Sequence, residues 1–168
     1  FLNPKEPEFR LEFLTTRHRG GEEPSFHPQL NVVLQPLPFM EFLLQHVEQA
    51  VVFSREKAVL VNVPDPARFA LHKLIVYGER TGSYRAKANK DLLQSASLLS
   101  YLWAHQRRTV TTALEDLHGR GKGWTSRFAV GSLALLKAHP DLEKAEGLAM
   151  ALLPGRRRPK RKAAKTTR

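Results

Sequence analysis

The sequence predicts an α+β protein, with strands in roughly its first third and helices in the remainder. The early part holds alternating or β-branched apolar residues separated by stretches rich in Gly, Pro and charge. From Pro66 onward the apolar residues recur at the three- and four-residue spacing of helices. Hydrophobic residues make up 42% of the 168 residues, which is enough for a packed core and excludes a chain that is disordered throughout.

The first predicted strand covers residues 9–15. Phe9, Leu11 and Phe13 alternate with the residues between them and therefore lie on one face of an extended chain. Residues 16–29 combine Gly, Pro and charged side chains and predict a loop.

A short strand over residues 30–35 follows, and we expect Pro36 and Pro38 to block regular pairing after it. Residues 39–47 predict about two helical turns. The next two β-branched runs, QAVVF and AVLVNV, are separated by SREK and predict an antiparallel hairpin.

The helical part begins with PARFALHKLIVYGER, for which Asp65 is the expected N-cap and Pro66 the first helical residue. Four more helices are predicted over 89–108, 109–120, 124–139 and 141–153. We expect the first of these four to be the longest, and Trp103 to be largely buried in it. Its apolar face consists of Leu92, Leu93, Ala96, Leu99, Leu102 and Trp103.

Charge is concentrated at the C-terminal end. The chain has 27 Lys and Arg against 16 Asp and Glu, and eight of the basic residues lie within 155–168, where no acidic residue occurs. This basic tail is predicted to be disordered and suits either non-specific contact with RNA or DNA phosphates or a merely solubilising role. It has no aromatic residue on which a base could stack, so base-specific recognition is not expected.

Several classes of protein are excluded by composition and motif. The chain has no Cys, which removes disulfide frameworks, Cys-ligated metals and Cys nucleophiles. No apolar run is long enough to span a membrane, and a cytoplasmic location is expected. Neither GxxxxGK[ST] nor GxGxxG is present, so the common nucleotide-binding loops are excluded.

Three places in the sequence have residues of the kind that bind metal or phosphate. Glu12 lies between Leu11 and Phe13 on a predicted strand and could offer a carboxylate to Mg²⁺, although the pattern alone favours an ordinary solvated Glu. Lys73 projects from an otherwise apolar helix and either reaches an anion or lies at the surface. The segment 85–91 leads into the longest predicted helix, where a bound phosphate is favoured. Its candidate site residues are Arg85, Lys87, Lys90 and Asp91. A solvated basic turn is the alternative.

The stretch VNVPDPARFALHKLIV followed by YRAKANKDLLQSASLL resembles a bacterial family of nucleotidyltransferase-fold proteins, distantly similar to the AbiEii-like toxin nucleotidyltransferases. The resemblance covers about residues 8–140 and is strongest over 61–99. It implies that Glu12, in FRLEFLT, is a metal-binding acidic residue and that Lys73 lies near nucleotide phosphates. Lys87, Lys90 and Asp91 look like a KxxKD element, similar to the RxKDxxD signature of that group.

The chain departs from that family because it lacks the GS motif followed by a DxD pair of acids. The resemblance therefore implies the C-terminal part of a Mg²⁺-dependent enzyme that transfers a nucleotidyl group from an NTP to an unknown acceptor, with this chain alone inactive. A non-catalytic module that binds nucleic acid or another partner is the alternative. The expected domains are a β-rich part over 1–63, a helical part over 64–153 and the basic tail over 154–168.

Overall fold

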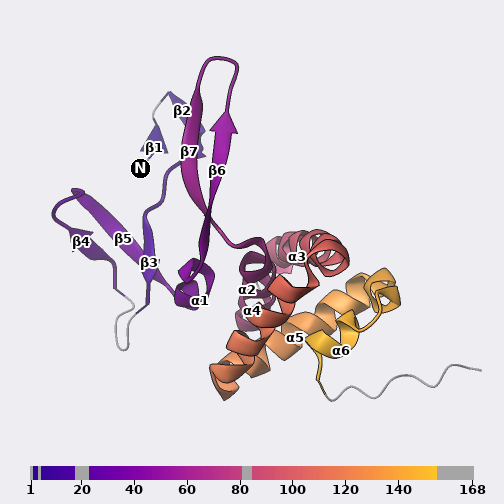
Figure 1. The fold of residues 1–168 in the computed structure, drawn as a ribbon. Helices are drawn as coiled ribbons and strands as arrows, with labels where there is room; N and C mark the ends of the chain where they lie inside the picture. The colour runs from indigo at the N-terminus through magenta and orange to yellow at the C-terminus, as the bar shows by residue number, and fades with distance from the viewer. Residues whose placement is uncertain (1, 4, 18–22, 81–84, 155–168) are drawn as a thin grey trace, which may run out of the picture. The chain divides into compact units, whose positions relative to one another are not determined.

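The computed structural model describes residues 2–3, 5–17, 23–80 and 85–154, and it confirms the α+β class. The chain divides into two compact units, Phe1–His72 and Lys73–Arg168. Every strand of the described chain lies before residue 65, and the helices that follow make up the second half (Figure 1). Helix α2 (Pro66–Glu79) crosses the boundary between the units.

The first strands depart from the prediction. β1 (Leu2–Asn3) pairs antiparallel with β2 (Glu6–Arg10), whereas β3 (Leu14–Thr16) belongs to a different sheet. The single strand predicted over residues 9–15 is therefore wrong, because the chain leaves strand geometry at residues 11–13 while it passes from one sheet to the next. Alternation of apolar residues cannot show such a change of pairing partner.

The second sheet has three strands in the order β3-β5-β4. β5 (Val32–Leu37) pairs parallel with β3 and antiparallel with β4 (Ser25–His27). The loop predicted over residues 16–29 thus contains a strand. Its three residues, Ser-Phe-His, are too short a run to give a periodic signal.

Pro36 lies inside β5 although a proline was expected to stop pairing there. Its neighbours bond to β3, since the N–H of Gln35 donates to the carbonyl of Phe13 at 2.8 Å and the N–H of Arg17 donates to the carbonyl of Leu37 at 3.2 Å. The missing N–H of Pro36 therefore faces the other side, beyond the end of the β4 pairing. A proline is tolerated where a strand edge carries no partner.

The predicted hairpin is confirmed. β6 (Val47–Phe53) pairs antiparallel with β7 (Ala58–Pro64) after the short helix α1 (Met40–Leu44), and the two strands form the long ribbon visible in Figure 1. Side chains on both faces of this hairpin are largely exposed, including Phe53 at 79%. The buried core of the first unit lies instead in α1 and the start of α2: Phe42, Ala67, Ala70 and Leu71.

The beginning of α2 follows the sequence prediction closely. The Asp65 carboxylate accepts a hydrogen bond from the Arg68 N–H at 2.8 Å, which makes Asp65 the N-cap, and Pro66 is the first helical residue. The Arg68 side chain is buried and donates to the carbonyl of Phe42 and to Oε1 of Gln45, at 3.3 and 3.2 Å. These contacts join α2 to α1 within the first unit.

The second unit is helical. Beside the end of α2 it contains α3 (Arg85–His105), α4 (Arg107–Gly119), α5 (Lys122–Ala138), the 3-10 helix η2 (Pro140–Lys144) and α6 (Leu148–Leu152). Helix α3 is the longest element described, and Trp103 is 7% exposed, as predicted. Leu93 was expected on the same face but is 57% exposed, because adjacent helical positions point about 100° apart.

Two predicted helices are interrupted. Gln106, with φ −139° and ψ 43°, separates α3 from α4 inside the helix predicted over residues 89–108. Trp103 Nε1 and Arg107 Nη2, on either side of this break, both donate to the carbonyl of Glu146, at 2.9 and 2.7 Å. The helix predicted over 141–153 is divided at Gly147, whose φ of 82° is not helical. The contacts with Glu146 accompany the first break, and the positive φ of Gly147 marks the second.

Helices α2 and α5 cross at two glycines. A Cβ on Gly131 would lie 2.8 Å from Cα of Leu74, and a Cβ on Gly78 would lie 2.8 Å from Cα of Arg127. Each glycine is therefore required for the other helix to approach this closely. Glu79 forms an ion pair with Arg127 beside the crossing and adds a polar contact to it.

Candidate functional site

Two cations meet on one carboxylate in the second unit. Nζ of Lys73 donates to Oδ1 of Asp91 at 3.1 Å. Nη1 of Arg80 lies 2.6 Å from Oδ2 of the same Asp91, as an ion pair whose alignment falls outside hydrogen-bond geometry. We refer to Lys73, Arg80 and Asp91 as the α2–α3 charge cluster.

The secondary structure brings these residues together. Lys73 and Arg80 are seven residues apart, so they project from one side of α2 and its C-terminal end, two turns from each other. The Arg80 N–H still bonds to the carbonyls of Val76 and Tyr77, which places the residue directly at the helix end. Asp91 comes from the second turn of α3. The glycine crossing fixes α2 in the position from which both cations reach it.

The three side chains of the cluster carry a formal charge of +1, and they are not equally accessible. The Asp91 side chain is 6% exposed, whereas Lys73 and Arg80 are 23% and 28% exposed. The carboxylate is thus covered by its cations, and the cations face solvent in part. Two partly exposed cations that share one carboxylate are suited to bind an anion with several oxygens, such as a phosphate group.

The structure brings together part of the site predicted from the sequence. Lys73 and Asp91 are in direct contact, and Lys90 is exposed beside Asp91. Arg85 and Lys87 lie in the first turn of α3, but their side chains are outside the described residues. Sequence reasoning missed Arg80. Its seven-residue spacing from Lys73 was the available signal, since it puts both cations on one helix face.

Glu12 lies in the first unit, in the link between β2 and β3, and is exposed. It lines an open groove of about 530 Å³ together with Asn31 and Gln35. The joint match of Glu12, Lys73 and the 85–91 segment to the family pattern predicts that they converge in space, and this stays a prediction.

The side chains around Glu12 fit Mg²⁺ only in part. The groove offers one carboxylate and two amide side chains, which are oxygen donors of the type that Mg²⁺ accepts. Within the described ranges, no group of three or more His, Asp or Glu side chains is placed to hold a metal ion. These residues therefore do not make up a magnesium site by themselves.

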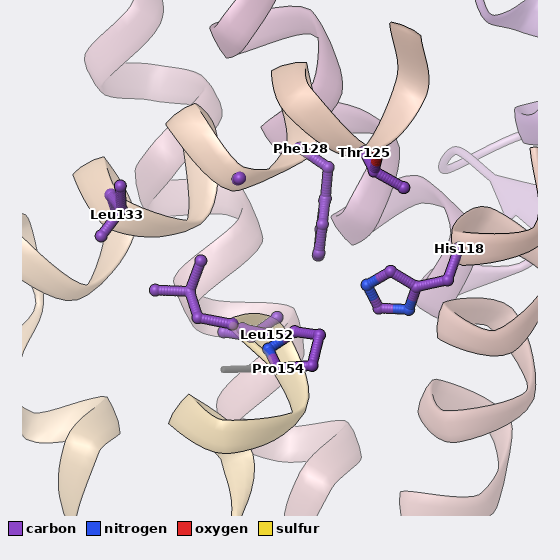
Figure 2. Close-up of a pocket in the computed structure, with 8 residues that line it drawn as sticks. His118, Thr125, Phe128, Leu133, Leu152 and Pro154 are labelled. Carbon is purple, nitrogen blue, oxygen red and sulfur yellow. The ribbon is translucent and has the colours of Figure 1, made fainter. Parts of the chain in front are cut away.

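A second hollow of about 390 Å³ lies between α4, α5 and α6. Figure 2 shows His118 and Phe128 pointing toward it from two helices, and their rings meet edge to face at 5.9 Å. Leu152, Pro154 and other mostly apolar residues complete the wall. Its lining contains no Lys, Arg, Asp or Glu, so it does not suit a phosphate.

A nucleotidyltransferase family model matches residues 2–118, and the chain belongs to this family. The match covers the strands, α2 and α3, and ends within α4, so it includes Glu12 and the whole charge cluster. No curated protein and no solved structure matches the chain. In the part of the chain that the structure describes, no helix is long and apolar enough to cross a membrane.

Proposed function

We propose that the α2–α3 charge cluster is the nucleotide-phosphate site of a protein that transfers a nucleotidyl group from an NTP to an acceptor. The observation on which this rests is the contact of Lys73 with Asp91 inside a region that matches the nucleotidyltransferase family. Lys73 binds phosphate oxygens as a point charge. Lys90 is exposed in the second turn of α3, near a helix N-terminus that favours anions.

Glu12 is proposed as one ligand of a Mg²⁺ site that other carboxylates complete. Two-metal phosphoryl transfer needs several carboxylates around the ions, and one Glu is too few. We therefore propose that the 168 residues bind an NTP but do not transfer its nucleotidyl group on their own. A bacterial, AbiEii-like membership within the family belongs to the same proposal and is supported by the KxxKD pattern that ends in Asp91.

Labelling tests the proposal. The natural polypeptide that contains this sequence is incubated with each of the four α-³²P-labelled NTPs, with Mg²⁺ or with EDTA. We expect label transfer with at least one NTP only when Mg²⁺ is present, and the 168-residue chain alone to transfer none. Label transfer that is equal with Mg²⁺ and with EDTA would contradict the metal dependence.

The role of Lys73 is tested in the same assay. Lys73→Ala is expected to weaken NTP use, because a point charge on the phosphates is lost. The matched control is Lys137→Ala, which removes an exposed Lys from α5. Equal label transfer by the two variants would overturn the assignment of Lys73.

The basic tail supports a second function. Its eight cations fit non-specific binding to RNA or DNA, which makes a nucleic acid a candidate partner of the chain. The tail lies outside the described residues.

A further inference from the structure

We infer that Arg80, which no sequence motif marked, is the second phosphate-binding cation of the site and recognises the pyrophosphate part of the NTP. This inference rests on the proposed function. Its basis is the placement of Arg80: its guanidinium reaches the same carboxylate as Lys73, within 2.6 Å, although the two residues are two helical turns apart.

The geometry gives the two cations a shared target. Each of them contacts a different oxygen of one carboxylate, so the two cationic groups lie on either side of a single small anionic group. Without the negative charge of Asp91 between them, the two cations would repel each other. The buried carboxylate thus acts as a positioning residue, which holds the Lys ammonium at one of its oxygens and the Arg guanidinium at the other while both stay partly exposed.

Two adjacent cations suit a diphosphate better than a single phosphate. Arg presents a planar fork of N–H donors that matches two phosphate oxygens, and Lys adds a point charge. In nucleotidyl transfer the bond from the acceptor oxygen to the α-phosphorus forms, and the bond from the α-phosphorus to the oxygen that bridges the α- and β-phosphates breaks. Pyrophosphate leaves with the electron pair, and the acceptor proton passes to solvent. Cations on the β- and γ-phosphates stabilise the charge that develops on this leaving group.

Arg80 directly follows Glu79, the last residue of α2. A cation at a helix C-terminus is favoured by the helix dipole, so Arg80 is stable in this place even without a ligand. That structural role does not depend on the identity of a bound anion. A test must therefore separate recognition of phosphate from a contribution to folding.

The experiment compares Arg80→Gln and Arg80→Lys with the control Arg108→Gln, which removes an exposed cation from α4 and changes the net charge equally. The affinities of the 168-residue chain for ATP, pyrophosphate and AMP are measured by calorimetry, and circular dichroism verifies that each variant is folded. Arg80→Gln is expected to weaken ATP and pyrophosphate binding by about tenfold or more, as for loss of a charge-assisted hydrogen bond. AMP binding is expected to be unchanged, and Arg80→Lys to recover part of the loss.

Three outcomes overturn the inference. If Arg80→Gln binds ATP and pyrophosphate within twofold of Arg108→Gln, Arg80 does not contact the ligand, although the proposed function stands. If Arg80→Gln weakens AMP by the same factor as ATP, its effect is structural. If the unsubstituted chain binds neither ATP nor pyrophosphate, the proposed phosphate site fails together with the inference.

Discussion

At the scale of single residues, Asp91 makes the contacts that hold the charge cluster together. Asp91→Asn removes the negative charge between Lys73 and Arg80 and leaves two like charges facing each other. We expect the free energy of unfolding to fall by about 1–3 kcal/mol, the usual value of hydrogen bonds to charged groups, with partial exposure of the cations limiting the loss. Urea unfolding measures it.

The control for this variant is Asp141→Asn, which changes an exposed carboxylate in η2 by the same chemistry. Its unfolding free energy is expected to change by less than about 0.5 kcal/mol. If the two variants unfold at the same urea concentration, the buried carboxylate contributes nothing to the helix contact and the role given to Asp91 is wrong.

Asp65 provides a second test at this scale. It caps α2 through the Arg68 N–H, so Asp65→Ala is expected to lower the free energy of unfolding by about 0.5–2 kcal/mol. Asp65→Ser keeps a side-chain acceptor at the N-cap and is expected to retain most of that stability. Thermal unfolding followed by circular dichroism compares the two, and equal losses would show that the cap is not the cause.

The sequence predicted single residues best where the signal is local. The Asp65-Pro66 pair marks a helix start by chemistry within four residues, and the structure has the start there. The contact of Lys73 with Asp91 depends on two helices and was not predicted, since the family pattern only assigned both residues to one site. Arg80 was missed because its partner is supplied by another helix and no local motif includes it.

At the scale of elements, the crossing of α2 and α5 fixes where the charge cluster can form. A Cβ on Gly131 would overlap the backbone of Leu74, so Gly131→Ala must push the two helices apart. We expect the free energy of unfolding to fall by about 1–3 kcal/mol or more, as for other overpacked cores. A change in the near-ultraviolet circular dichroism is expected with it.

Gly119→Ala is the matched control, since a Cβ there meets nothing within 4 Å. It is expected to leave stability unchanged or raise it slightly, because Ala restricts the unfolded chain more than Gly does. If Gly131→Ala were as stable as this control, the close approach of α2 to α5 would be disproved.

Element boundaries show why part of the fold could not be predicted. The helical spacing of apolar residues predicted α2, and two β-branched runs predicted the hairpin of β6 and β7, since these patterns extend over many residues. It failed at residues 11–13 and at Gln106, because changes of sheet and of helix direction are decided by partners far along the chain. Contacts of this kind leave no period in the sequence.

At the scale of the whole molecule, the formal charge of +11 arises mostly from the basic tail, residues 155–168. Deletion of the tail is expected to remove most of the binding to a random single-stranded DNA. The intact chain is expected to lose affinity steeply between about 50 and 200 mM salt, because bound phosphates release counterions. Fluorescence anisotropy measures both, and equal binding by the shortened chain would show that another basic surface makes the contact.

The central claim is that the α2–α3 charge cluster binds the phosphates of an NTP. The most direct measurement is an NMR titration of the ¹⁵N-labelled 168-residue chain with ATP, whose triphosphate is common to all NTPs. We expect the amide shifts that change most to come from residues 73–80 and 88–95, around Lys73, Arg80 and Asp91. Shifts that instead centre on His118 and Phe128, or no shift at millimolar ATP, would contradict it.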